Sequence, residues 1–438
     1  MGPLQSKRRE FLRWCGQGLT VAPFASLLSC GKNQGLGPNR GGNPFTGTDE
    51  QLLDSIQRSS FQFFWNETNP ATGQVKDRAF LNGNDTRAMS SIAATGFGLT
   101  ALCIGDSRGY AATADITNRV RTTLQFLYQR VPNVHGFYYH FVDMNTGKRW
   151  AQCELSSIDT SILLCGVLTA RQYFQDAIIQ DLASKLYNQV DWPWMLNGGN
   201  TFSMGWTPES GFLTARWDHY CELMMIYLLG IGSTTHPVPA STWNAWTRPT
   251  INYQGLTYIS GNDPLFTHQY SHAWFDFRNK KDAYANYFDN SVTATKAHKL
   301  FCLSLTSQFS DYSDSLWGIS ASDYAKGYTA WGGPPPIGPI DGSIVPCATG
   351  GSLPFLYPDC IRVLRNIRRT YGAKAWGLYS YVDAFNPLSG WYDTDVLGID
   401  LGITMLMAEN YRTYLIWNTF MKNPEAQAAM QKVGFQQA

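Results

Sequence analysis

The sequence of 438 residues predicts an all-α protein with one large domain. Three observations lead to this class. About a dozen segments place apolar residues at helical spacing, few segments alternate as strands do, and the chemically reactive side chains fall on the connections between helices. No linker divides the chain after Asp49. A closed ring of helical hairpins would gather such connections at one end.

The predicted helices follow one another at short intervals. In the first helix, from Asp49, the residues Leu52, Leu53 and Ile56 begin an apolar face, and the helix ends before Asn69-Pro70. Residues 135–150 predict a β-hairpin, and the Pro/Gly-rich residues 332–342 predict a loop. Further helices are expected at 90–104, 114–130, from Asp159 onward, and at 181–189, 220–232, 289–307, 354–371, 398–410 and 411–422.

The composition favours a protein that binds carbohydrate. Hydrophobic residues make up 44% of the chain, aromatic residues 14% and charged residues only 15%. Aromatic faces are platforms for the apolar faces of sugars, although aromatic residues also fill large cores. The net charge of +1, without a Lys/Arg stripe, argues against nucleic-acid binding.

The N-terminus predicts export. Residues 6–13 (SKRREFLR) resemble a twin-arginine signal, and an apolar run follows that ends at Leu27-Leu28-Ser29-Cys30-Gly31. This ending resembles a bacterial lipobox, in which Cys30 would be lipidated. We therefore assign residues 1–30 to an export signal, 31–48 to a flexible tether and 49–438 to the folded domain. The protein is expected to be periplasmic or an outer-membrane lipoprotein, held to the membrane only by this anchor.

Cysteine spacing predicts neither a zinc site nor a disulfide framework. Seven cysteines remain after Cys15 and Cys30, and none forms a Cys-x-x-Cys pair. Most of them are expected to be buried thiols.

The stretch from Phe202 to Pro237 contains the first catalytic candidate. A loop rich in Gly, Trp and Pro leads into an apolar helix, and Glu222 lies where the two meet. An apolar environment raises the pKa of a carboxyl group, as a catalytic acid requires. The alternative is that Glu222 caps the helix or pairs with Arg216.

Several long motifs occur in the same order as in a known family. They are GFYYHFVDMNTGKR with ELSSIDTSILL, GWTPESGFLTARWDHYCELMMIYLLGIGSTTHP, FTHQYSHAWFDFR, DNSVTATKA, WGISASDYAKGY and LGIDLGITMLMAENYRTYLIW. The chain resembles the bacterial glycoamylase-like domain family and, within it, glycoside hydrolase family 144, over essentially all of residues 49–435. The resemblance implies an (α/α)6 barrel with an acidic cleft and inverting hydrolysis of β-1,2-linked glucans by endo- or sophorose-releasing exo-type action.

The resemblance also implies three catalytic carboxylates. Glu222 in WDHYCEL and Asp400 in GIDLG match the two principal positions, and Glu154 in ELSSIDT matches a third. The chain departs from the family pattern after Asp400, where a Gln-Gly-Pro sequence is expected, and at residues 219–221, where Gly-Tyr-Asn is expected.

An inverting glycosidase needs an acid and a base roughly 6.5–9.5 Å apart. We expect Glu222 to be the acid, because its apolar helix would keep it protonated. Asp400 is expected to be the base, because Tyr392-Asp-Thr-Asp395 and Gly398 indicate an open, polar approach. Glu154 is the rival for either role. Helix capping is the structural alternative for both Asp400 and Glu154.

Substrate contacts are expected from the aromatic and polar loops. A metal site at residues 268–278 was the alternative, but the aromatic interleaving there favours sugar contacts, and no metal or other cofactor is expected. For each tryptophan, core filling is the alternative. The predicted substrate-binding residues are Trp206, Arg216, Trp217, Asp218, His268, Tyr270, His272, Trp274, Asp276 and Trp391.

Two non-catalytic interpretations compete with the enzyme. A surface glycan-binding lipoprotein would use the same aromatic loops without a carboxyl pair, and a structural ring protein would not need the polar loop clusters. The sequence favours a monomeric hydrolase whose partner is a β-glucan polysaccharide or oligosaccharide.

Overall fold

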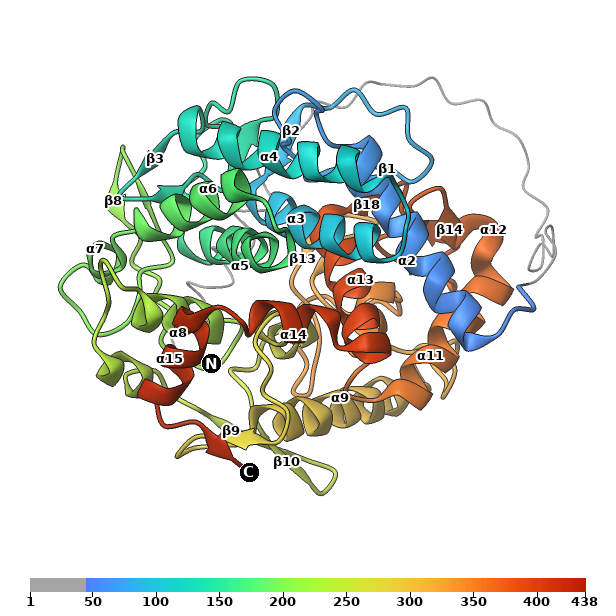
Figure 1. Cartoon of the computed structure of the whole chain (residues 1–438). Helices are drawn as coiled ribbons and strands as arrows, with labels where there is room; N and C mark the ends of the chain where they lie inside the picture. The colour runs from blue at the N-terminus through green and yellow to red at the C-terminus, as the bar shows by residue number, and fades with distance from the viewer. Residues whose placement is uncertain (1–44) are drawn as a thin grey trace.

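The computed structural model describes residues 45–438. The helices form a closed ring, in which the first helix of the described residues, α2 (Asp49–Asn66), lies beside the late helices α11 (Tyr357–Asn366) and α13 (Gly398–Thr413) (Figure 1). The predicted signal, tether and Cys30 lie outside the described residues.

The outer helices are amphipathic. Each of them buries one face and exposes the other, as expected for a helix between a core and solvent. They are α2 (Asp49–Asn66), α4 (Thr113–Gln129), α6 (Ala177–Asn188), α9 (Tyr287–Ser304) and α11 (Tyr357–Asn366).

The inner helices are buried on nearly every side, which is why their sequences are apolar almost throughout. A 3-10 turn, η3 (Tyr270–Ala273), occupies the place of a sixth inner helix between α8 and α10. The inner helices are α3 (Ile92–Ser107), α5 (Ser157–Tyr173), α8 (Met224–Gly232), α10 (Pro346–Gly350) and α13 (Gly398–Thr413).

Two glycines let α3 and α5 approach each other closely. A Cβ atom added at Gly166 would lie 2.1 Å from the carbonyl oxygen of Gly96, and one added at Gly96 would lie 2.5 Å from that of Ile162. Only hydrogen fits in this space, so backbone-to-backbone packing fixes the distance between the two helices.

Backbone hydrogen bonds join the N-terminal ends of three inner helices. Gly398 N at the start of α13 donates to Asp77 O, and Asp77 N donates to Met89 O just before α3. Ile92 N in α3 donates to His140 O, and His140 N donates to Glu154 O just before α5. The starts of α13, α3 and α5 therefore lie at the same end of the barrel.

Side-chain hydrogen bonds connect the starts of the other inner elements in the same way. Trp217 Nε1 donates to Ser157 Oγ at the start of α5, over 2.8 Å. Ser271 Oγ in η3 accepts from Met225 N in α8 and donates to Glu222 O. Cys347 in α10 hydrogen-bonds to Asp400 in α13. Residues at the starts of all six inner elements are thus brought to one end.

The strands of the described residues are short. Most of them pair in twos, as β1 (Arg78–Phe80) does with β18 (Asp395–Leu397) and β2 (Met89–Ser91) with β5 (Phe141–Asp143), and β6–β7–β8 form a three-stranded sheet. The other strands are β3 (Asn133–Val134), β4 (Phe137–Tyr138), β6 (Leu155–Ser156), β7 (Gly205–Thr207), β8 (Gly211–Phe212), β9 (Thr250–Tyr253), β10 (Leu256–Ile259), β11 (Lys280–Lys281), β12 (Ser322–Tyr324), β13 (Gly327–Thr329), β14 (Trp376–Gly377), β15 (Ser380–Tyr381), β16 (Phe385–Asn386), β17 (Trp391–Tyr392) and β19 (Gln436–Gln437).

Short helical turns complete the ring. They are α7 (Trp192–Leu196), η1 (Ala240–Asn244), η2 (Leu265–His268), η4 (Ile367–Tyr371), α12 (Gly372–Ala375), α14 (Leu415–Phe420) and α15 (Pro424–Lys432).

Some predicted boundaries differ from the structure. The helix expected at 220–232 begins at Met224, so Glu222 lies in the preceding turn. The helix expected at 354–371 changes to a wider turn after Asn366. The hairpin expected within 135–150 is present, because Val142 pairs with Arg149 and Asp143 N donates to Lys148 O across the turn. On its other side, β5 also pairs with β2 before α3.

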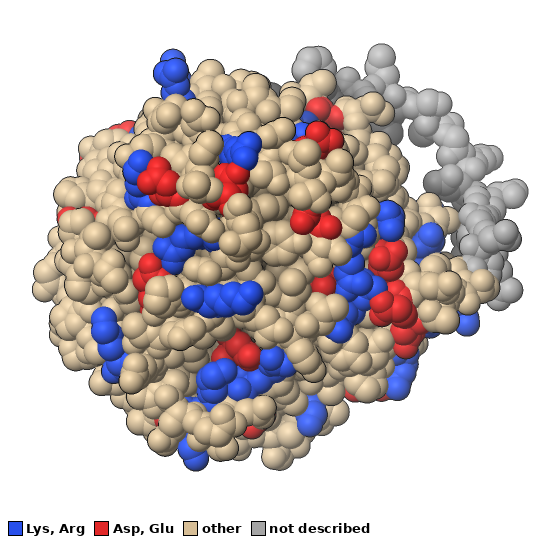
Figure 2. All heavy atoms as spheres, in the orientation of Figure 1, with Lys and Arg blue, Asp and Glu red and all other residues tan. Residues whose placement is uncertain are grey.

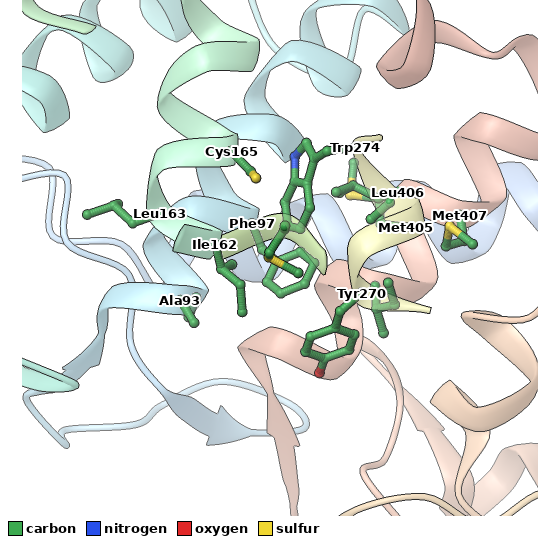
Figure 3. Close-up of a cluster of buried hydrophobic side chains, with 14 of the residues drawn as sticks. Ala93, Phe97, Ile162, Leu163, Cys165, Tyr270, Trp274, Met405, Leu406 and Met407 are labelled. Carbon is green, nitrogen blue, oxygen red and sulfur yellow. The ribbon is translucent and has the colours of Figure 1, made fainter. Parts of the chain in front are cut away.

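One hydrophobic cluster runs through the barrel. Phe97 from α3, Trp274 and the residues 405–407 of α13 pack together in its centre, whereas the hydroxyl of Tyr270 points away from the cluster (Figure 3). None of the helices within residues 45–438 has the length and apolar content that crossing a membrane requires.

Candidate active site

Glu222 lies in the turn before α8 and is buried. Its backbone carbonyl accepts a hydrogen bond from Ser271 Oγ over 2.7 Å, which ties the turn to η3. Arg216, its predicted alternative partner, directs its guanidinium to the carbonyl oxygens of Leu196 and Thr201. Arg216 therefore holds this loop together, and its predicted substrate contact stays a prediction.

Glu154 precedes β6 and is paired with His140. The distance from Glu154 Oε1 to His140 Nδ1 is 2.9 Å, and His140 Nε2 lies 3.7 Å from Asp159 Oδ1. Burial alone would raise the pKa of Glu154, but the charge and hydrogen bond of His140 outweigh it and hold this pKa below its usual range. The cap of α5 is Ser156, so Glu154 is not a helix cap.

Asp400 is the third residue of α13 and is buried. The residue at the N-cap is Leu397, and no side chain caps this helix, so helix capping does not explain the aspartate. Burial raises the pKa of Asp400, while hydrogen bonds from Asp383 and Cys347 act in the opposite direction. Asp400 is thus a buried carboxyl group joined by hydrogen bonds to Asp383 and Cys347.

Arginine side chains neutralise the acidic network beside Asp400. Arg78 in β1 binds Asp77 at 3.0 Å and Asp323 at 2.5 Å. Arg87 holds both carboxylate oxygens of Asp395 at 2.6 and 2.9 Å. Ion pairs of this kind fix the positions of β1 and of β18, the strand that directly precedes α13.

Tyr270 is near enough to both principal carboxylates to experience their charges. Burial raises the pKa of its hydroxyl, and the charges of Asp400 and Glu222 raise it further. A carboxylate from α13 and one from the turn before α8 therefore act on one neutral phenol. This arrangement is the observation that joins the two predicted catalytic residues in space.

Other predicted contacts in the segment 268–278 are distant from Asp400. Asn410, ten residues farther along α13, binds the carbonyl oxygen of Ala273, and ten residues of helix span about 15 Å. Asp276 pairs with Arg278, whose guanidinium lies 4.0 Å from the ring centre of Tyr414 beyond the end of α13. The structure thus places Asp276 at the opposite end of α13 from Asp400.

The histidines of this segment are core residues. His268 binds the hydroxyl of Tyr220, and His272 binds that of Ser291. Burial lowers the pKa of each to about 3, so both are neutral. Trp274 is fully buried and donates to Thr100 Oγ1, which leaves no face for a sugar.

The other predicted aromatic contacts differ in exposure. Trp206 in β7 and Trp391 in β17 are half-buried and keep part of their rings accessible. Trp217 is buried and donates to Ser157 Oγ, so it joins its loop to the start of α5. Asp218 is half-buried and lies 2.8 Å from His219 Nδ1.

Sequence reasoning missed His140, Asp383 and Cys347. The signal for His140 was a lone histidine within the aromatic run GFYYHF. Asp383 is the one carboxyl in the otherwise apolar segment YVDAF, a pattern typical of a buried acid. Cys347 was interpreted only as a buried thiol, and nothing in its local sequence indicates the contact with Asp400.

One group of side chains among residues 45–438 has the spacing of a cation site. Carboxylate oxygens of Asp323, Asp383 and Asp393 lie within 4.8 Å of one another. Arg78 already supplies positive charge to Asp323. On the face of the described chain in Figure 2, acidic and basic side chains are interspersed, without a continuous basic stripe.

The fold and these carboxylates define an α/α barrel of the kind that carries glycoside hydrolase sites. Residues 214–424 match the Glycoamylase family model, described as a putative glucoamylase. This part of the chain thus matches the model of a glycoamylase-like domain, and the resemblance inferred from the motifs is confirmed.

Relatives with solved structures share the whole fold. The TM-score is 0.84 with a putative glucoamylase from Bacteroides uniformis, at 28% identity over 90% of this chain and 99% of that one. It is 0.81 with an endo-β-1,2-glucanase from Chitinophaga pinensis, bound to sophorotriose and glucose, at 28% identity over 89% of this chain and 99% of that one. The predicted (α/α)6 class is confirmed.

A curated relative from Parabacteroides distasonis is an exo β-1,2-glucooligosaccharide sophorohydrolase acting at the non-reducing end. It is 29% identical over 425 aligned residues, which cover 88% of this chain. The chain spans 58% of the length of that relative.

Proposed function

We propose that the protein is a glycoside hydrolase that cleaves β-1,2-linked glucan or its oligosaccharides with inversion of configuration. The observation that carries the proposal is the position of Tyr270, which experiences the charges of both Asp400 and Glu222. Relatives of similar fold include an endo-β-1,2-glucanase and a sophorohydrolase, which supports this substrate class.

Glu222 is the proposed general acid. It gives its proton to the glycosidic oxygen as the bond between that oxygen and the anomeric carbon breaks. Asp400 is the proposed base and takes a proton from the water that attacks the opposite face of the same carbon. Glu222 ends ionised and Asp400 protonated, and proton exchange with solvent restores both.

The ends of the inner helices favour this division of roles. Helix N-termini carry partial positive charge, and Asp400 lies in the first turn of α13. That location stabilises an ionised base. The half-buried rings of Trp206 and Trp391 are the proposed sugar platforms.

Incubation with linear β-1,2-glucan tests the proposal. Product sizes identify endo or exo action, and NMR recorded early in the reaction should show a new reducing end of α configuration. Glu222→Gln should lose turnover and keep binding. The matched control is Asp181→Asn, at an exposed carboxylate on α6. Oligosaccharide binding by the wild type without any turnover would instead favour a glycan-binding lipoprotein.

We also propose export by the twin-arginine route and lipid attachment at Cys30. The arginine pair, apolar run and cysteine in this order support the proposal. Replacing Arg8 and Arg9 with Lys should leave the protein in the cytoplasm, and Cys30→Ala should abolish lipid attachment. Cys30→Ala protein that still partitions with membranes after a high-salt wash would contradict the lipobox.

A further inference from the structure

Asp383 and Asp400 hydrogen-bond to each other through their carboxyl groups. Each has a buried oxygen, Asp383 Oδ1 and Asp400 Oδ2, that receives no N–H or hydroxyl donor from the described chain. Two ionised carboxylates are acceptors only. The contact therefore requires that the pair share one proton.

The surroundings decide which residue holds that proton. Asp383 lies among acids, because carboxylate oxygens of Asp323 and Asp393 lie within 4.8 Å of its own. Asp400 instead has a thiol donor in Cys347 and the positive end of α13. Like charges favour the neutral form of Asp383, whereas donors favour the ionised form of Asp400.

The backbone fixes the orientation of Asp383. Its Oδ2 accepts from Asp323 N over 2.7 Å, and its own backbone N donates to Asp395 O over 3.0 Å. One oxygen is thus committed to β12, and the other is left for Asp400.

We propose that Asp383 is a positioning residue for Asp400: it remains protonated and donates a hydrogen bond that orients the Asp400 carboxylate and keeps it ionised. This inference rests on the proposed function, in which Asp400 is the base. It makes the base one half of a carboxyl pair and not a lone carboxylate.

The pKa directions agree with this assignment. Burial raises the pKa of Asp383 well above its usual range, and the neighbouring Asp400 raises it further. Burial raises the pKa of Asp400 as well, but the hydrogen bonds from Asp383 and Cys347 oppose this rise. For Asp383, by contrast, the hydrogen bond with Asp400 adds to the rise of the pKa. Other charged or titratable groups around the pair are Arg78, Tyr270, Asp323, Tyr328, Cys347 and Asp393.

The kinetic test compares two substitutions of similar size. In Asp383→Asn, the amide oxygen can accept from Asp323 N while the NH2 group donates to Asp400, so the geometry is preserved. The leucine of Asp383→Leu offers neither an acceptor for Asp323 N nor a donor to Asp400. On β-1,2-glucan, we expect Asp383→Leu to lower kcat about 100-fold with little change in KM, within the range of general-base contributions. The acid limb of the pH profile of kcat for Asp383→Leu should move to higher pH. The reason is that Asp400 has lost the hydrogen bond from Asp383, so its pKa rises.

Asp383→Asn should recover most of that loss and remain within about tenfold of the wild-type kcat, whereas Asp400→Asn should not. Asp181→Asn is the surface control. A loss in Asp383→Asn as large as in Asp400→Asn would overturn the proposal, because it would mean that Asp383 must ionise. An unshifted acid limb in Asp383→Leu would overturn it as well.

Unfolding as a function of pH tests the pair without any substrate. A folded-state pKa raised above the unfolded value means that the folded state binds more protons, so stability decreases as pH rises from about 4. Asp383→Asn lacks this group, so the Tm of the wild type should fall relative to that of Asp383→Asn between pH 4 and 8. If Tm changed with pH in the same way for the wild type and for Asp383→Asn, the shared proton would be refuted. Wild-type protein that fails to cleave β-1,2-glucan but shows this divergence would refute only the proposed function.

Discussion

His140 Nδ1 lies 2.9 Å from Glu154 Oε1, and the pairing keeps this buried carboxylate ionised. An ionised group has no proton to give, so Glu154 does not fit the role of the acid. It can instead orient substrate hydroxyls or hold His140 in place. The contact therefore argues against Glu154 as the general acid and leaves that role to Glu222.

Glu154→Gln is therefore expected to reduce kcat/KM about 10- to 100-fold, the effect of removing a charged hydrogen bond worth about 1.5–3 kcal/mol. The loss should be the same for β-1,2-glucan and for an aryl glycoside whose leaving group needs no protonation. Glu222→Gln should be much less impaired on the aryl substrate. A selective recovery of Glu154→Gln on that substrate would instead identify Glu154 as the acid.

The fold was largely predictable because its helices carry their own signals. From Gly398 to Ala408 the residues of α13 are apolar except for Asp400 and Thr404, and the prediction of 398–410 ended only a few residues before the observed Thr413. The short strands gave no such signal. Arg78 pairs with Leu397 across more than 300 residues of chain, and strands of two or three residues have no periodicity to recognise.

The site was predictable in part, for a related reason. Residue types indicated Glu222 and Asp400, but their environment depends on residues far away in the sequence, such as Asp383. In the segment 268–278, similar aromatic and polar residues lie near different ends of α13. Tyr270 lies near Asp400, whereas Asp276 lies beyond Asn410. Composition alone cannot separate these two positions.

Gly166→Ala should destabilise the barrel although alanine is the better helix former. The propensity gain is roughly 0.5–1 kcal/mol, but the new Cβ would lie 2.1 Å from Gly96 O. Overpacking typically costs about 1–3 kcal/mol. Backbone atoms cannot rotate away, so we expect a cost near the upper end of this range and, after the propensity gain, a net loss of about 2 kcal/mol. Urea unfolding measures it.

The control is Gly109→Ala, where an added Cβ meets no atom within 4 Å and the cost comes only from the positive φ of 65°, about 1–2 kcal/mol. Stability of Gly166→Ala equal to or above that of Gly109→Ala would contradict the close approach of α3 and α5.

Buried histidines should make the protein sensitive to acid. Burial lowers the pKa of His268 to about 3, against an ordinary value of 6.5. The unfolded state therefore binds more protons between these values, and stability falls as pH decreases from 6.5 towards 3, by about 1.4 kcal/mol per pH unit for each such histidine. His268→Gln should reduce this slope in urea titrations. The control His135→Gln replaces an exposed histidine, and an equal reduction there would argue against a buried neutral His268.

Azide separates the role of the base from that of the acid. In Asp400→Asn the attacking water is no longer deprotonated, and we expect a loss of about 10²–10⁴-fold. Azide needs no deprotonation and can enter the space of that water. It should restore turnover and give a glycosyl azide of inverted configuration, detectable by NMR. In Glu222→Gln the missing step is protonation of the leaving oxygen, so azide should not restore cleavage of the glucan. Rescue of Glu222→Gln but not of Asp400→Asn would reverse the two roles, because the rescued variant is the one that lacks the water-activating group.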